Sequence, residues 1–185
     1  MEKEFRQSLS IKERVIVKYN PKYYDAKGVY TKDEWTEFSD IGRLFDGKRL
    51  SIEEYLEAEN NFIAFVNDCL DIAGCRYLTI NWSWEYEKKV FRDRIKNVCK
   101  LDPSFDESDC LTLIHEIEAK NRVSIPIAMY LFKLMLRNAF NLSLSNGKRK
   151  IKFYMGYEYY LHFFTCIDSE TLKKIADKRN LYVVW

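Results

Sequence analysis

The sequence predicts an α+β fold: a helix-dominated single domain over residues 1–185 with a small, mainly antiparallel sheet. Three observations support this prediction. Apolar residues recur at intervals of three and four in several long segments, which is the spacing of one helix face. Shorter segments alternate apolar and polar residues, as half-buried strands do. No internal repeat and no glycine-, serine- or proline-rich linker divides the chain, so one domain is expected.

The N-terminal third contains the clearest helix. A β-branched run at residues 15–17 first predicts a strand. Residues 51–73 then carry apolar side chains at helical spacing, which predicts a long amphipathic helix. Ser51 is a suitable N-cap with Glu54 three residues later, and Gly74 is suited to end the helix.

The middle of the chain alternates between strand and helix patterns. Residues 77–84 alternate as a half-buried strand does, and a lysine- and arginine-rich helix is expected at about 87–99. A further helix is expected after Asp106 or Ser108, either of which can cap it. Residues 124–140 are apolar on nearly every side, which predicts a helix in the centre of the fold.

The C-terminal third predicts a hairpin and three further elements. Asn146-Gly147 lies between two alternating segments, which is the strongest short hairpin signal. Residues 157–164 predict another strand. A helix over 169–180 and a terminal strand over 181–185 complete the expected order.

The composition limits the class of protein. The 185 residues are 47% hydrophobic and 31% charged, with six glycines and three prolines, which supports a buried core and excludes a low-complexity chain. No run of 18 apolar residues occurs, and the first 14 residues lack the pattern of a secretory signal. Five scattered cysteines favour free thiols in a reducing compartment. We therefore expect a cytoplasmic protein that does not enter a membrane.

Charge is distributed unevenly along the chain. The total is only +2, which argues against a nucleic-acid binder. Residues 33–59 hold nine acids and three bases, residues 102–118 hold six acids and no base, and residues 119–154 hold eight bases and no acid. These blocks either pair with one another and solvate the fold, or form an acidic face that attracts a basic partner.

Motifs for catalysis or cofactor binding are absent from the sequence. His115 and His162 lack neighbours at the spacing of a metal site or a catalytic triad. No CxxC, GxGxxG, GxSxG or phosphate-binding loop occurs. The carboxylates are numerous enough for a hydrolase, but no spacing selects a catalytic pair. We therefore expect no enzyme, no metal site and no cofactor.

Several short segments nevertheless follow a known pattern. KYNP, KDEWTE, SDIG, FDGK and EEYLEAE stand at residues 18–21, 32–37, 39–42, 45–48 and 53–59. Together they resemble a family of bacterial immunity proteins encoded beside polymorphic toxins, including those of contact-dependent growth inhibition systems. Two later segments are more loosely similar to its LRE and GYDYY elements, with Asn138 in place of Glu and Glu158 in place of Asp. These two stand at 136–138 and 155–160.

The resemblance implies a small cytoplasmic protein that neutralises one cognate toxin domain. Such toxins are often nucleases, and the immunity protein occludes the active site or a nearby surface. Because immunity families diversify most at the toxin contact, the resemblance also implies structural roles for motif residues such as Trp35, Gly42, Gly47 and Tyr159.

The acidic blocks suit such a partner, because carboxylates can substitute for nucleic-acid phosphates on a basic surface. We expect the contact on the acids of the 51–73 helix and of the 102–109 segment, through charge-assisted hydrogen bonds to lysine or arginine. The predicted partner-binding residues are Glu53, Glu57, Asp102, Asp106, Glu107 and Asp109.

An RNA-binding or RNA-processing module is the alternative interpretation. The basic 119–154 block lies near four tyrosines, and aromatic rings beside basic groups stack on unpaired bases. The near-neutral total charge favours the first interpretation, in which no direct nucleic-acid contact is expected. The tyrosines are Tyr154, Tyr157, Tyr159 and Tyr160.

Overall fold

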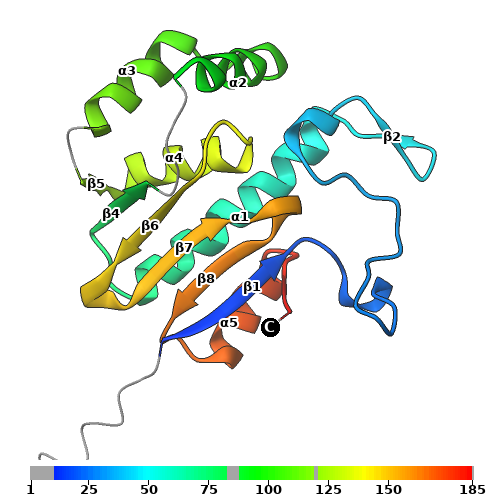
Figure 1. The fold of residues 1–185 in the computed structure, drawn as a ribbon. Coiled ribbons are helices and arrows are strands. Elements are labelled where there is room, and N and C mark those ends of the chain that lie inside the picture. The colour runs from blue at the N-terminus through cyan, green and yellow to red at the C-terminus, as the bar shows by residue number, and fades with distance from the viewer. Residues whose placement is uncertain (1–10, 83–87, 119–120, 185) are drawn as a thin grey trace, which may run out of the picture.

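A seven-stranded antiparallel sheet forms the centre of the molecule (Figure 1). The computed structural model describes residues 11–82, 88–118 and 121–184. The strand order is β5-β4-β6-β7-β8-β1-β9, and β2 and β3 form a separate two-stranded ribbon. The strands are β1 (Lys12–Val17), β2 (Leu44–Phe45), β3 (Lys48–Arg49), β4 (Tyr77–Trp82), β5 (Arg122–Ser124), β6 (Leu142–Asn146), β7 (Ile151–Met155), β8 (Leu161–Thr165) and β9 (Tyr182–Val183).

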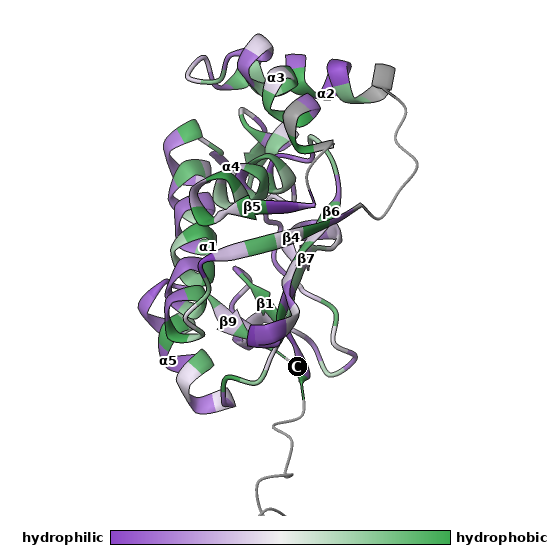
Figure 2. Ribbon diagram, turned by 90° about the vertical axis from the view of Figure 1, so that its left-hand side faces the viewer, coloured by the Kyte–Doolittle hydropathy of each residue, from purple (hydrophilic) through white to green (hydrophobic). Residues whose placement is uncertain are grey.

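The helices cover one face of this sheet. Helices α1, α4 and α5 lie on the same side of it, and α2 and α3 contact each other beyond α4, at the top of Figure 2. The helices are α1 (Ile52–Ile72), α2 (Lys88–Leu101), α3 (Glu107–Glu118), α4 (Ile125–Leu136) and α5 (Ser169–Lys178). In the described part of the chain, no helix is both long and apolar enough to cross a membrane.

The expected helix-dominated fold with a small sheet is wrong. The fold is a mixed α+β one, because seven strands form a continuous sheet across the molecule. Strands β5 and β9 have only three and two residues, too few to show an alternating pattern. Strand β1 pairs with β8 and β9, from the other end of the chain, so its place in the sheet depends on contacts that no local pattern records.

The predicted long helix is confirmed as α1, and its ends follow from local chemistry. The Ser51 hydroxyl accepts a hydrogen bond from the Glu54 amide at 3.2 Å. Gly74 follows the helix with φ +63°, a left-handed conformation that glycine adopts without strain. The predicted strand at 77–84 is confirmed as far as Trp82, and its last two positions lie outside the described residues.

Helix α4 is buried on nearly every side, as predicted for residues 124–140, but it ends at Leu136. Asn138 takes φ +56°, and its amide donates to the Met135 carbonyl at 3.0 Å. The Ala139 amide donates to the Leu134 carbonyl at 3.0 Å. These are the two hydrogen bonds of a Schellman motif, and asparagine tolerates the left-handed position that closes it.

The region after α4 contains the predicted hairpin, formed by β6 and β7. Its connection is a 3-10 turn rather than a two-residue turn, because the Asn146 side chain accepts from the Arg149 amide at 3.1 Å. The predicted strand over 157–164 is wrong in its first half. Residues Tyr157–Tyr159 form a left-handed turn, with φ +55° at Glu158 and +63° at Tyr159, which a Gly156 amide hydrogen bond to the Tyr160 carbonyl closes, and β8 begins only at Leu161.

Burial differs between the two faces of the sheet. Alternate residues such as Ile80, Phe153 and Phe163 face α1, α4 and α5 and form the main core. On the opposite face, a second cluster around Val15 and Val17 of β1 is packed by tyrosines of the N-terminal loop and the C-terminal strand. In the described part of the chain, the opposite face is therefore covered at the β1 end, and its side chains on β4 and β7, together with Ser145 of β6, remain at least partly exposed.

Candidate partner-binding surfaces

Five of the six predicted partner-binding acids lie on the surface, in two sets. Glu53 and Glu57 are exposed on α1, and Asp106, Glu107 and Asp109 stand at the start of α3. We call these sets the α1 acids and the α3 acids. Asp106 caps α3 by accepting from the Asp109 amide at 3.0 Å. Hydrogen bonds from the Glu53 backbone and the Ser51 hydroxyl lower the pKa of Glu53, so this carboxylate is charged at neutral pH.

The sixth predicted acid, Asp102, is not available to a partner, so this prediction is wrong. It is buried, and its Oδ2 accepts from Arg137 Nη1 at 2.7 Å. Its Oδ1 accepts from the Ser104 amide at 3.0 Å and from the Ser104 hydroxyl at 2.7 Å. Burial alone would raise the pKa of Asp102, but the hydrogen bonds from Ser104 and Arg137 outweigh it and keep the pKa below its ordinary value.

Arg137 is the centre of a buried ion network. Its Nε and Nη2 donate to the two oxygens of Glu59 on α1 at 2.6 and 2.9 Å, a bidentate pair. Lys133 adds a second cation 3.6 Å from Glu59. The guanidinium lies 4.3 Å from the ring centroid of Phe105, which covers it. This network joins α1, α4 and the α2–α3 connection, with two acids and two bases in balance.

Two tyrosines close the end of α4 beside this network. The Tyr159 hydroxyl donates to the Leu136 carbonyl at 2.8 Å. The Tyr55 hydroxyl donates to the same carbonyl at 3.2 Å and also contacts the Tyr159 hydroxyl. That carbonyl is among the last of the helix and has no intrahelical partner. Burial raises the pKa of both hydroxyls, so they remain protonated donors. The Trp35 ring packs 5.1 Å from Tyr159 and 5.4 Å from Tyr55.

A second ion pair holds the N-terminal loop against Trp35. Lys18 Nζ lies 2.9 Å from Glu34, and the Tyr30 hydroxyl donates to the same carboxylate at 2.7 Å. The ammonium also lies 3.9 Å from the centroid of the Trp35 ring. Burial lowers the pKa of Lys18 to about 8, and the charge of Glu34 offsets only part of this effect.

The FDGK segment forms the hairpin of β2 and β3. Asp46 and Gly47 both have positive φ, +48° and +78°, as a type I′ turn requires. Lys48 then pairs with Glu54 in the first turn of α1. Gly47 thus has a conformational role, in agreement with what the resemblance implies for it.

The motif segments therefore meet in space although they are scattered over residues 18–160. Segment 32–37 contacts 18–21 through the Lys18 ion pair, and it contacts 53–59 and 155–160 through the Trp35 ring. Segment 53–59 contacts 136–138 through Glu59 and Arg137. Asn138, which departs from the family pattern, adds a hydrogen bond to Glu37 at 3.3 Å. We call the shared set the motif cluster; its members are Lys18, Glu34, Trp35, Tyr55, Glu59, Arg137 and Tyr159.

Similarity to known proteins adds nothing to these contacts. The chain matches no protein-family model, no curated protein and no solved structure. The structural roles described for the motif residues therefore rest on their contacts in this structure.

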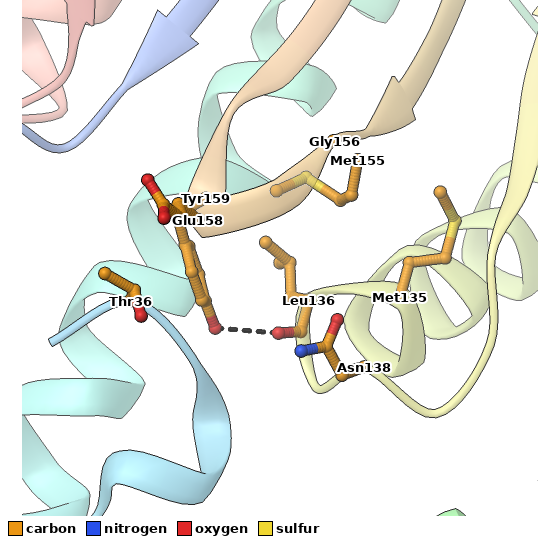
Figure 3. A pocket seen from close by; sticks show the side chains of 8 residues that line it. All are labelled: Thr36, Met135, Leu136, Asn138, Met155, Gly156, Glu158 and Tyr159. Atoms are coloured by element: carbon orange, nitrogen blue, oxygen red, sulfur yellow. Dashed lines mark hydrogen bonds between the residues drawn. The ribbon is translucent and has the colours of Figure 1, made fainter.

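Cavities offer little room for a small ligand. The one beside the motif cluster has a volume of about 10 Å³, enough for about one water molecule. Figure 3 shows Tyr159 reaching across it to the Leu136 carbonyl. A shallow depression of about 240 Å³ lies between the N-terminal loop and β9. Within the described ranges, no group of three histidine, cysteine, aspartate or glutamate side chains is placed to hold a metal ion.

The basic 119–154 block is divided between the two sides of the molecule. Arg137 and Lys133 belong to the buried network, whereas Arg122 and Lys152 lie on the strands. Of the nearby tyrosines, Tyr159 is buried in the motif cluster. Lys120 lies outside the described residues. The block as a whole therefore does not form one basic surface, and Arg122 and Lys152 are the two of its bases that the strand registers place on one face of the sheet.

The sequence named Arg122, Lys152 and Tyr154 for the alternative interpretation, but not the surface that the strands place them on. On the sheet face opposite α1, α4 and α5, partly exposed aromatic side chains lie beside exposed basic ones. We call this surface the open sheet face. Alternation within β7 and β8 was the available signal, since it assigns every second residue to that side. The members are Tyr77, Thr79, Asn81, Arg122, Ser145, Lys152, Tyr154, His162 and Phe164.

Proposed function

We propose that this chain is a bacterial immunity protein that acts in the cytoplasm, where it binds and neutralises a cognate toxin domain with a basic, nuclease-type active site. The convergence of the motif segments carries the proposal. Seven residues from five of the motif segments form the motif cluster, which is largely buried; Lys18 pairs with Glu34, and Arg137 pairs with Glu59 and with Asp102 outside the cluster. This is the behaviour expected of residues that preserve a fold while the toxin contact diversifies.

The α1 acids and α3 acids are the proposed toxin contact. They are separate from the motif cluster and carry carboxylates on the surface rather than in ion pairs of the core. A nuclease binds phosphates with lysine and arginine, and a carboxylate surface can occupy the same groups. Inhibition of this kind needs no bond-making step by the immunity protein. Its contribution is occlusion of the active site or of a surface next to it.

The first test uses purified proteins. The gene immediately upstream supplies the candidate toxin, whose C-terminal domain is assayed for nucleic-acid cleavage with and without this chain. We expect one equivalent of this chain to abolish cleavage through a complex that survives gel filtration. Cleavage that continues at tenfold excess, or an upstream domain without toxicity, would contradict the proposal.

The second test separates the function from the placement of the contact. The five surface acids are changed together to lysine, and the control is Glu170→Lys on α5, where the side chain is 78% exposed. We expect the fivefold variant to lose binding and the control to retain it. Affinity and salt dependence equal to those of wild type would show that the contact lies elsewhere on the protein. The five acids are Glu53, Glu57, Asp106, Glu107 and Asp109.

A further inference from the structure

The open sheet face carries an ordered row of side chains. The strand registers place Arg122 opposite Thr79, Thr79 opposite Ser145, and Ser145 opposite Lys152. Lys152 in turn lies opposite Phe164. Because residues opposite one another in an antiparallel sheet share a face, these side chains cross β5, β4, β6, β7 and β8 on one side.

Three aromatic rings form a platform on β7 and β8 of this face. The rings of Tyr154 and His162 are 4.8 Å apart and nearly parallel, at 9°. The ring of Phe164 lies 6.0 Å from that of Tyr154, at 28°. All three side chains are partly exposed, although their strand neighbours Phe153 and Phe163 are fully buried. Tyr154 also packs against the main core, whereas Phe164 belongs to neither core cluster, and part of each side chain is left at the surface.

Cations and hydrogen-bonding groups surround the platform. Lys152 Nζ lies 5.9 Å from the centroid of Tyr154 and 5.8 Å from that of Phe164. Arg122 stacks over Tyr77, with its Cζ 3.2 Å from the ring centroid. Among the described residues in these registers, the acid on this face is Glu13, which is paired with His162 at 2.8 Å.

We propose that the open sheet face binds single-stranded RNA. Unpaired bases would stack on Tyr154 and Phe164, and phosphates would lie against Lys152 and Arg122. The charge is complementary to an anionic strand and unsuited to a basic toxin. Thr79 and Ser145 lie between the two cations, and the Asn81 amide donates to the Ser145 hydroxyl at 3.0 Å. The remaining donors and acceptors of these groups can pair with ribose 2′-hydroxyls, which favours RNA over DNA.

This function goes beyond neutralisation of a toxin and rests on different residues. It also departs from the expectation that the protein makes no direct nucleic-acid contact. That expectation came from a total charge of +2, which averages the acidic blocks with this face. A local surface attracts an anion according to its own charges within about a Debye length.

Fluorescence anisotropy with a labelled ten-nucleotide uridine RNA and the full chain tests the proposal. At 50 mM salt we expect a Kd on the order of 10 μM. Two phosphate contacts predict a loss of affinity of about sevenfold between 50 and 200 mM salt. Absence of binding at 100 μM protein, or equal affinity for the matching thymidine DNA, would overturn the assignment to RNA.

Substitutions locate the binding on the face. Tyr154→Leu and Phe164→Leu retain apolar volume and remove the ring, and each should weaken binding about tenfold. The matched control is Tyr157→Leu, where the side chain is 89% exposed on the turn before β8. Lys152→Ala should reduce the salt dependence, whereas Lys174→Ala on α5 should not. Thermal unfolding of each variant confirms that the fold is retained.

Two results would overturn this placement. If the leucine variants are folded and bind RNA as tightly as wild type does, the aromatic platform does not contribute to RNA binding. Loss of toxin binding in the same variants, without any RNA binding by wild type, would assign the face to a protein contact instead.

Discussion

The acids of this chain divide into two regions that differ in what surrounds them. Glu59 and Asp102 are buried against Arg137, whereas Glu57 and Asp106, two and four residues away, are exposed. Helical spacing separates the first pair, because Glu59 lies on the apolar face of α1, four residues after Tyr55 and three before Phe62. No such pattern separates Asp102 from Asp106. The difference comes from Arg137, which is 78 residues from Glu59 along the chain.

This comparison shows that a count of charges along a stretch of sequence does not separate buried acids from exposed ones. The acidic blocks combine carboxylates that are held in ion pairs with exposed carboxylates for which the described residues show no ion pair. Asp40 and Glu54 also belong to the first kind, since Arg43 and Lys48 pair with them. Only the remaining surface acids can attract a toxin. The predictions below test this division, from the largest expected effect to the smallest.

Removal of the shared cation should have the largest effect. Arg137→Met leaves Glu59 and Asp102 buried without their partner, which costs about 3–5 kcal/mol in the free energy of unfolding. Urea denaturation measures the loss. The control is Arg94→Met on the exposed side of α2, which should change stability by less than about 0.5 kcal/mol. A loss below about 1 kcal/mol at Arg137 would mean that the network does not hold α1, α4 and the α2–α3 connection together.

Two glutamates of α1, the buried Glu59 and the exposed Glu57, allow the most direct comparison. Glu59→Gln removes a charge that accepts two hydrogen bonds from Arg137, and it should reduce stability by about 2–3 kcal/mol. Glu57→Gln should change it by less than about 0.5 kcal/mol. Toxin binding should show the opposite order, with Glu57 contributing and Glu59 acting only through folding. Equal effects of the two substitutions on stability would contradict the division.

Neighbouring tyrosines provide a second matched pair. Tyr159→Phe removes the hydroxyl that donates to the Leu136 carbonyl, so we expect a loss of about 1–2 kcal/mol. Tyr157→Phe changes an exposed hydroxyl and should be neutral. Thermal unfolding of the two variants under identical conditions makes the comparison. Similar melting temperatures for both would show that the capping of α4 contributes little.

The smallest effect concerns the Lys18 ion pair. The folded-state pKa is about 8, below the ordinary 10.5, so between these values the unfolded chain binds more protons than the folded one. Stability should therefore rise with pH from 8 to 9.5, relative to a Lys18→Met variant that lacks this titration. Urea midpoints at pH 7, 8 and 9.5 measure the difference. If the stability of wild type relative to Lys18→Met falls from pH 8 to 9.5, the folded state does not lower the pKa of Lys18.

Local patterns predicted the elements whose cause is local. Helix α1 has its cap, apolar stripe and terminal glycine within one segment, and α4 is apolar on every side. The hairpin of β6 and β7 follows from alternation around Asn146-Gly147. These elements lie where the sequence places them, apart from ends that side-chain hydrogen bonds determine.

The rest depends on contacts between distant segments. Strand β1 joins the sheet through β8, with Lys12 opposite Thr165, and the turn at 157–159 contains Tyr159, which donates to the Leu136 carbonyl at the end of α4. Asp102 was predicted as a partner-binding acid because the local sequence does not show that Arg137, 35 residues away, lies beside it. The open sheet face was not predicted for the same reason, since its side chains form a row only when five strands are aligned in register.

The most direct test of the central claim is the growth of cells that express the upstream toxin domain. We predict that wild-type protein and Glu170→Lys restore growth and co-purify with the toxin. The variant with lysine at all five surface acids should fold yet fail in both respects. Growth that wild-type protein does not restore, despite its soluble expression, would contradict the account.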